Sequence, residues 1–173
     1  MNSGIWKKII WFYYLDYNKA YPIPQPIYYT VYDIFSYNDP ELIINDGYGS
    51  HKCTIYTYID SKVTEIFSIY NCEYIYYYPD SRRLSAYTIE NGYNYFSFYY
   101  IRDPNRFIKD FDFSYTEHED KTVSYEFNGE KVTKEQYNKY LDEYSDKIPG
   151  LYENKVELSG GTEYCEKYKK YKR

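Results

Sequence analysis

The sequence predicts an α+β fold, namely an antiparallel β-meander of about eight to nine short strands with an N-terminal helix and a C-terminal helix packed on it. Three observations support this class. Aromatic residues alternate along short segments such as residues 93–100, and turn residues separate these segments. A helical spacing of apolar residues occurs only before and after this region. The strand–helix–strand alternation of a parallel sheet is therefore not expected.

The N-terminal helix is predicted for residues 5–19. Its apolar stripe, at helical spacing, consists of Trp6, Ile9, Ile10, Tyr13, Tyr14 and Tyr17. Pro22, Pro24 and Pro26 follow the helix, and proline neither continues a helix nor donates to a strand ladder. Residues 20–26 are therefore predicted to form an extended connector into the sheet.

Short β-rich segments then follow one another without a helical pattern until position 134. Asn91-Gly92 and Asn128-Gly129 are the strongest hairpin signals, because a type I′ turn needs positive φ at both central residues. We predict strands near residues 27–34, 41–45, 53–59, 62–70, 74–78, 83–89, 93–101, 107–115 and 122–127.

A second helix is predicted after residue 133. Thr133 and Gln136 have the spacing of a capping box, in which each side chain caps the backbone of the other. The apolar stripe of this helix, Tyr137, Tyr140, Leu141 and Tyr144, is typical of a helix that packs on a sheet. We expect one domain over residues 1–150 and a C-terminal extension over residues 151–173, with a short strand at 155–158, a polar helix after Gly160-Gly161 and a basic end.

The chain contains 30 tyrosines among 173 residues, with a formal net charge of −5. Leucine is scarce, so tyrosine has to fill much of the core. Burial of a tyrosine contributes roughly 4–6 kcal/mol, more than the roughly 1–3 kcal/mol that an unpartnered hydroxyl costs. The negative charge argues against nucleic acid as a partner, since phosphates require clustered Lys and Arg.

No segment reaches the length of a membrane span. Residues 4–15 begin like a signal peptide, but Asp16 closes the apolar run and no small-residue cleavage site follows. The expected location is secreted or cell-surface if an export signal has been removed, and cytoplasmic otherwise.

The three cysteines, Cys53, Cys72 and Cys165, form no Cys-x-x-Cys pair, so the sequence supports neither a zinc site nor a redox motif. Cys53 and Cys72 fall in strands predicted to be neighbours. Two alternatives follow for them, a disulfide or two free buried thiols.

Three features in chain order resemble a group of largely uncharacterised exported or cell-surface proteins of Gram-positive bacteria. These features are the aromatic N-terminal helix with Trp6-Lys7-Lys8, the segment 32–44 and the segment 125–137. In that group a D-x-D/N-x-D-G-x-P-E-L loop, similar to the calcium loops of integrin-like repeats, begins an antiparallel meander, and an N-G hairpin with a helix closes it. The resemblance spans residues 5–146.

The resemblance implies a calcium loop whose remaining oxygen donors would be Asp33, Asn38, Asp39 and Glu41. Calcium takes six to eight oxygen ligands, many of them carboxylates. Phe35 and Tyr37 stand where the loop pattern has Asp or Asn. We therefore expect no cofactor, with calcium as the less favoured alternative and Glu41 as a residue that simply begins the second strand.

The sequence does not favour an enzyme. Asp110 with Asp112, or Glu117 with Glu119, could serve a glycosidase as an acid pair, but no feature of the sequence predicts the burial that would raise one pKa.

A non-catalytic binding module is the favoured function, with a protein or carbohydrate partner. Tyrosine provides a large contact area at small entropic cost. The proposed binding residues lie on strands with aromatics on both faces and are Tyr74, Tyr76, Tyr78, Tyr93, Tyr95 and Tyr99. Alternation does not tell which face is exposed.

The alternative function is that of an acidic inhibitor or immunity-type protein, of phage origin in one version, that covers a basic surface on an enzyme or toxin. The acidic segment 110–120 would then form an ordered ridge. Separately from this function, the basic end, residues 167–173, is expected to be a solvated tail, with an electrostatic contact to an acidic partner as the alternative.

Overall fold

The computed structural model describes residues 3–20, 27–35, 39–46, 52–90, 92–103, 106–145 and 155–164. The chain divides into two units, one formed by residues 1–70 together with 158–173 and the other by residues 71–157.

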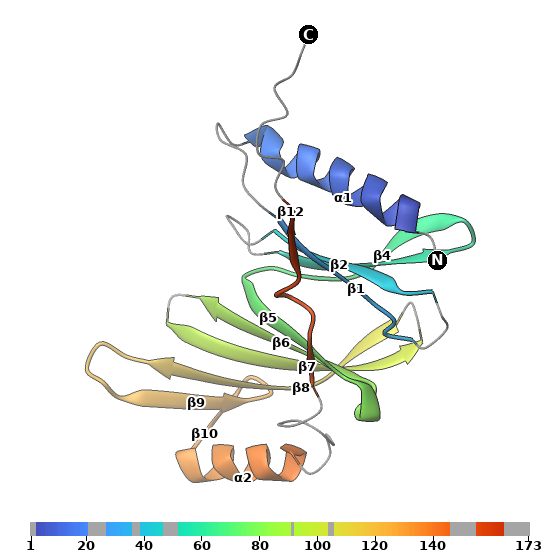
Figure 1. The fold of residues 1–173 in the computed structure, drawn as a ribbon. Helices are drawn as coiled ribbons and strands as arrows, with labels where there is room; N and C mark the ends of the chain where they lie inside the picture. The colour runs from blue at the N-terminus through green and yellow to red at the C-terminus, as the bar shows by residue number, and fades with distance from the viewer. Residues whose placement is uncertain are drawn as a thin grey trace. The chain divides into compact units, whose positions relative to one another are not determined.

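The first unit contains a helix and a five-stranded antiparallel sheet. Helix α1 (Ser3–Tyr17) is followed by the 3-10 turn η1 (Asn18–Ala20). The strands are β1 (Ile27–Tyr32), β2 (Glu41–Asn45), β3 (Cys53–Ile59), β4 (Lys62–Ile69) and β12 (Thr162–Tyr164). Their order is β12-β1-β2-β3-β4, so a strand from the C-terminal part pairs with β1. Figure 1 shows α1 lying along this sheet.

The core of the first unit lies between α1 and the sheet. Trp6, Ile10 and Tyr14 recur on one side of α1 and pack with Leu42 and Ile44 of β2. The helix forms because its apolar residues have the spacing that one buried face requires. The predicted N-terminal helix is thus confirmed, and residues 21–26 of the predicted connector lie outside the described residues.

The second unit contains a seven-stranded antiparallel sheet and helix α2 (Lys134–Ser145). Its strands are β5 (Cys72–Tyr78), β6 (Arg83–Glu90), β7 (Tyr93–Asp103), β8 (Arg106–Glu117), β9 (Val123–Phe127), β10 (Glu130–Val132) and β11 (Val156–Glu157), with the 3-10 turn η2 (Pro79–Ser81) after β5. The order is β10-β9-β8-β7-β6-β5-β11, so six consecutive strands form a meander and β11 pairs with β5.

Helix α2 packs on one face of this sheet, toward β8 and β9 (Figure 1). Phe98, Phe111 and Phe113 form the buried cluster there together with Tyr78 and Tyr137. The ring of Phe111 lies 4.1 Å from that of Tyr144 between centroids, and Phe127 stacks on Tyr140 at 4.4 Å. The predicted tyrosine stripe of the helix is therefore a core surface.

The tight turns follow the predicted chemistry. Asn128 and Gly129 have φ values of 51° and 79°, the positive pair that a type I′ hairpin requires. Asp60 and Ser61, between β3 and β4, also have positive φ, at 49° and 62°. The α2 capping box is present as well, because the backbone N–H of Thr133 donates to Gln136 Oε1 at 2.9 Å and that of Gln136 donates to Thr133 Oγ1 at 3.2 Å.

The predicted α+β class with antiparallel strands is confirmed, and each predicted strand has a counterpart within a few residues. The strands belong to two sheets, however, because the chain leaves the first sheet after β4 and begins the second at β5. Cys53 and Cys72 are thus not in neighbouring strands, and both are buried thiols that form no disulfide. The predicted C-terminal helix is wrong at residues 162–164, which form β12.

Glu41 is the first residue of β2 and is only 2% exposed. Its carboxylate accepts hydrogen bonds from the Ile34 backbone N–H at 2.9 Å and from Thr57 Oγ1 at 3.2 Å. Burial raises the pKa of Glu41 from 4.5 to about 7, although these two hydrogen bonds act in the opposite direction. The residue therefore begins the second strand, as the sequence suggested, and closes the preceding loop.

This pKa shift predicts a pH-dependent stability. The raised pKa means that between pH 4.5 and about 7 the folded chain keeps a proton on Glu41 that the unfolded chain releases. The stabilisation is complete below the unfolded pKa and is lost as the pH rises through the folded pKa. Glu41→Gln should remove this dependence and, above pH 7, increase the free energy of unfolding by up to roughly 3 kcal/mol.

Urea denaturation at a series of pH values measures this effect. Glu90→Gln, at an exposed position of β6, is the control and should leave the pH profile unchanged. An identical profile for the parent and Glu41→Gln would show that Glu41 is not the titrating group.

Loss of the capping box should destabilise α2. We expect Thr133→Ala to lower the free energy of unfolding by about 0.5–2 kcal/mol, because the N–H of Gln136 loses its acceptor. Gln136→Glu keeps both hydrogen bonds and should have little effect. Thermal melts of the two variants measure the difference, and equal midpoints would contradict a role for the cap.

Candidate functional site

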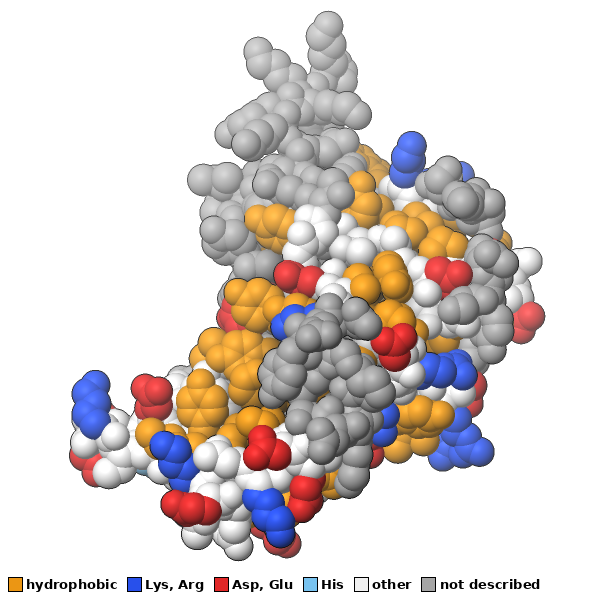
Figure 2. Space-filling view, turned by 60° about the horizontal axis from the view of Figure 1, so that its bottom comes forward, with side chains coloured by type: hydrophobic (Ala, Val, Ile, Leu, Met, Phe, Trp, Pro, Cys, Tyr) orange, Lys and Arg blue, Asp and Glu red, His pale blue; other side chains and the backbone are white. Residues whose placement is uncertain are grey.

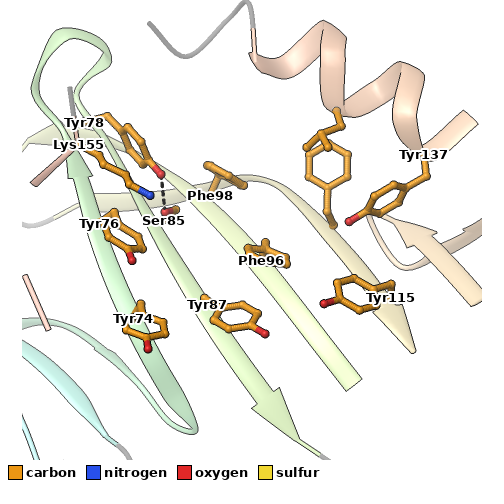
Figure 3. Close-up of a pocket in the computed structure, with 12 residues that line it drawn as sticks. Tyr74, Tyr76, Tyr78, Ser85, Tyr87, Phe96, Phe98, Tyr115, Tyr137 and Lys155 are labelled. Atoms are coloured by element: carbon orange, nitrogen blue, oxygen red, sulfur yellow. Dashed lines mark hydrogen bonds between the residues drawn. The ribbon is translucent and has the colours of Figure 1, made fainter. Parts of the chain in front are cut away.

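An aromatic groove lies on the α2 face of the seven-stranded sheet, beyond the part that the helix covers. Side chains alternate between the two faces of a strand, so residues two apart share a face. The groove, shown in Figure 3, has a volume of about 440 Å³ and is lined by Tyr74, Tyr76, Tyr78, Ser85, Tyr87, Phe96, Phe98, Phe113, Tyr115, Tyr137, Leu141 and Lys155.

Neighbouring rings in the open part of the groove are nearly parallel. The centroid of Tyr74 lies 6.1 Å from that of Tyr76, with 19° between the ring planes, and 6.2 Å from that of Tyr87, with 12°. Contacting carbon atoms are about 3.5–4.0 Å apart, so parallel rings at such centroid distances are offset and leave part of each face uncovered. Figure 3 shows these three rings beside one another along β5 and across to β6.

The strand register holds this arrangement in place. Tyr74 pairs with Tyr87 across β5 and β6, and Tyr87 pairs with Phe96 across β6 and β7. Tyr87 stacks on Phe96 at 4.5 Å between centroids. Because the backbone ladder determines these pairs, the rings are arranged before any ligand arrives.

Three hydroxyls in and around the groove, those of Tyr78, Ser85 and Tyr87, form hydrogen bonds with other side chains. Tyr78 Oη and Ser85 Oγ are 3.0 Å apart and share a hydrogen bond (Figure 3). Tyr87 donates its hydroxyl to Asn94 Oδ1 at 2.6 Å. Burial, followed by the neighbouring Tyr115, raises the pKa of Tyr87, so the phenol remains protonated and donates.

Lys155 is the charged residue of the groove lining. Its Nζ atom lies 4.1 Å from the ring centroid of Tyr76, within the range of a cation–π contact. No carboxylate lines the groove, and in the part of the chain that the structure describes no carboxylate forms an ion pair with Lys155. The groove thus combines an aromatic floor with one positive charge.

The surface around the groove is apolar on a larger scale. In Figure 2, hydrophobic side chains lie side by side in the lower left part of the view, with charged side chains around them. Tyr74 is 43% exposed, and the edge strand β11 pairs with Tyr76 and Tyr77 of β5 but not with Tyr74. Such contiguous exposed apolar surface is typical of binding sites.

The six tyrosines predicted to bind a partner are divided between the two faces. Tyr74, Tyr76 and Tyr78 line the groove, with Tyr78 almost buried. Tyr93, Tyr95 and Tyr99 alternate with Phe96 and Phe98 along β7 and therefore lie on the opposite face. Sequence reasoning did not select Tyr87, Phe96 and Tyr115, although each lies on a predicted strand, and no sequence signal indicated Lys155.

A polar network occupies the opposite face near β7–β9. Tyr93 donates to Glu126 Oε2 at 2.5 Å and lies 2.9 Å from Ser114 Oγ. Lys109 contacts Tyr95 Oη and Asp112 Oδ2, each at 2.5 Å. Burial lowers the pKa of Lys109, but the hydrogen bonds to Asp112 and Tyr95 outweigh it and the pKa is raised overall. These tyrosines are thus engaged within the sheet.

The acid pair considered for catalysis is bound by two different cations. Asp110 Oδ2 accepts from Arg83 Nε at 2.9 Å, whereas Asp112 pairs with Lys109. Asp112 is buried and Asp110 is more exposed. Glu117 and Glu119 are exposed at the end of β8 and in the turn that follows.

The calcium prediction can be followed at three of its four residues, because Asn38 lies outside the described part. Asp33 is half-buried, Asp39 is exposed, and both carboxylate oxygens of Glu41 already accept hydrogen bonds. Across the described ranges, no group of three or more His, Cys, Asp or Glu side chains could hold a metal ion.

Comparisons of the chain with protein-family models, with curated proteins and with solved structures found no match. The search for membrane spans covered the described residues and found no helix of sufficient length and apolarity.

The Tyr78–Ser85 contact predicts a measurable coupling. In a double-mutant cycle, Tyr78→Phe and Ser85→Ala should each lower the free energy of unfolding, and together they should cost about 1 kcal/mol less than the sum of the two changes. Denaturant unfolding of the four proteins measures the coupling. Strict additivity would mean that the two side chains do not interact in solution.

Proposed function

We propose that this protein is a non-catalytic binding module that holds a protein or carbohydrate partner in its aromatic groove. The observation that carries this proposal is the set of near-parallel rings of Tyr74, Tyr76 and Tyr87, which α2 leaves uncovered. Core tyrosines, such as Tyr137 of α2, are buried between the helix and the sheet, so core packing does not account for the open ones.

The small entropic cost of binding to ordered rings supports the same proposal. The rings are held in register by the strand ladder, and tyrosine has few rotatable bonds. A surface that is already ordered loses little conformational entropy when a partner binds. Contact with the groove would also remove apolar ring surface from water, at about 25 cal/mol per Å².

The resemblance of residues 5–146 to exported proteins of Gram-positive bacteria supports a role at a bacterial surface or in secretion. An exposed module with an aromatic groove suits that setting, since its partners would be other surface components. This setting is part of the proposal and rests on the resemblance alone.

The acidic inhibitor is the second candidate, supported by the exposed carboxylates of Glu117, Glu119 and Asp120 between β8 and β9. Asp110 and Asp112 pair with Arg83 and Lys109, so part of the acidic segment is neutralised within the sheet. This leaves fewer free charges than the sequence suggested and makes the groove the better supported site.

Substitution of the groove should abolish binding. We expect the double variant Tyr74→Ala/Tyr87→Ala to lose binding by tenfold or more to any ligand that the parent retains from a glycan array or a displayed peptide library. The matched control is Tyr70→Ala/Tyr100→Ala, since these tyrosines are also exposed, at 60% and 38%, but do not line the groove. Thermal melts verify folding of both.

Two results would contradict the proposal that the groove is the binding site. Ligand binding that survives Tyr74→Ala/Tyr87→Ala would exclude it directly. Binding that is lost in Glu117→Gln/Glu119→Gln/Asp120→Asn, and that weakens steeply with salt, would favour the acidic inhibitor instead.

A further inference from the structure

We infer that the ligand of the aromatic groove is an acidic oligosaccharide, whose sugar rings stack on Tyr74, Tyr76 and Tyr87 and whose carboxylate binds Lys155. This inference rests on the proposed function and deepens it by naming the class of ligand. The ring geometry, the size of the groove and its charge support it.

The ring geometry suits a pyranose. The flat face of a sugar ring presents C–H groups, which carry a slight positive charge, and the face of an aromatic ring is negative. Tyr74 is nearly parallel to both Tyr76 and Tyr87, with angles of 19° and 12° between the planes. Adjacent, offset and nearly parallel ring faces provide stacking positions for consecutive sugar units.

The hydroxyls at the edges of these rings suit the same ligand. Tyr74 and Tyr76 have no hydrogen-bond partner among the residues that the structure describes. Each phenol can donate one hydrogen bond and accept others. Sugar hydroxyl groups around a stacked ring are therefore natural partners for both tyrosines.

The size of the groove favours an oligosaccharide over a protein. A volume of about 440 Å³ lies within the roughly 300–1,000 Å³ range of small-ligand sites. A standard protein interface uses about 20–30 residues on each side. The groove lining contains fewer residues than this, and its hollow form suits a chain of rings better than a flat protein surface.

The charge of the groove favours an acidic sugar over a neutral one. Lys155 is the lining residue with a charge, and its ammonium group faces the ring of Tyr76 at 4.1 Å. No carboxylate is among the lining residues, and the nearby carboxylates, Glu157 beside Tyr76 and Glu73 beside Tyr87, lie outside the lining. A ligand carboxylate would form a charge-assisted hydrogen bond with Lys155, which is roughly twice as strong as a neutral one.

The experiment compares a charged oligosaccharide with its neutral form on the full chain. The probes are trigalacturonic acid, triglucuronic acid and the methyl ester of each trimer, in which the carboxylates lose their charge and the rings keep their shape. Titration calorimetry at low ionic strength gives the four dissociation constants. We expect at least one acid to bind tenfold or more tightly than its ester.

Variants assign this preference to named side chains. Lys155→Gln should reduce the preference for the acid over the ester to near unity. Lys131→Gln, at an exposed position of β10, is the matched control and should keep the full preference. Tyr74→Ala/Tyr87→Ala should abolish binding of both the acid and the ester, with folding verified by thermal melts.

Each result that differs from these expectations would contradict a specific part of the inference. Equal binding of acid and ester would overturn the charge assignment and leave a carbohydrate groove in place. Failure of all four probes to bind would overturn the acidic oligosaccharide, whereas a peptide that depends on Tyr74 and Tyr87 would still uphold the proposed binding function. Acid binding that survives Tyr74→Ala/Tyr87→Ala would place the sugar elsewhere and overturn the inference.

Discussion

The size of α2 relative to its sheet is the constraint on which the candidate site depends. The helix has 12 residues, which corresponds to about 18 Å of length and about 10 Å of width. The seven strands, at about 4.8 Å spacing, span roughly 29 Å. One short helix therefore covers the sheet near β8 and β9 and leaves the same face open at β5 and β6.

This partial cover gives the same residue type two roles on one face. Between the helix and the sheet, Phe111 and Phe113 of β8 and Tyr137 of α2 are removed from water and form a packed core. Beyond the helix, Tyr74 and Tyr87 belong to the same face but remain partly exposed. The chemistry of the ring is equal in both places, so coverage by α2 decides which tyrosines stabilise the fold and which can contact a ligand.

Side-chain pairing likewise determines which charged residues keep a charge that a ligand could contact. The segment 110–120 is acidic in sequence, yet Asp110 and Asp112 are neutralised by cations from β6 and β8. Lys155, in contrast, keeps its charge. It is one of many lysines in the sequence, but it lies over an aromatic ring and has no carboxylate partner among the described residues. The free charge of a site is thus determined by side-chain contacts, some of which, such as Arg83–Asp110 and Lys155–Tyr76, join residues that are distant in sequence.

The amino-acid sequence by itself determined the local structure. Strand positions follow from alternation, the hairpin at Asn128-Gly129 from its positive φ angles, and the start of α2 from the mutual hydrogen bonds of Thr133 and Gln136. These features depend on residues close together in the chain, so their spacing is sufficient to predict them.

Only the tertiary structure decided which sheet each strand joins and which face is covered. A turn between two strands has similar residues whether the next strand pairs with the previous one or begins another sheet, which is why Cys53 and Cys72 were wrongly placed in neighbouring strands. Alternation showed that Tyr74, Tyr76 and Tyr78 share a face, but the position of α2 decided that this face forms the groove. Lys155 directly precedes the two-residue strand β11. The pairing of β11 with β5, a long-range contact, places the charge of Lys155 at the groove.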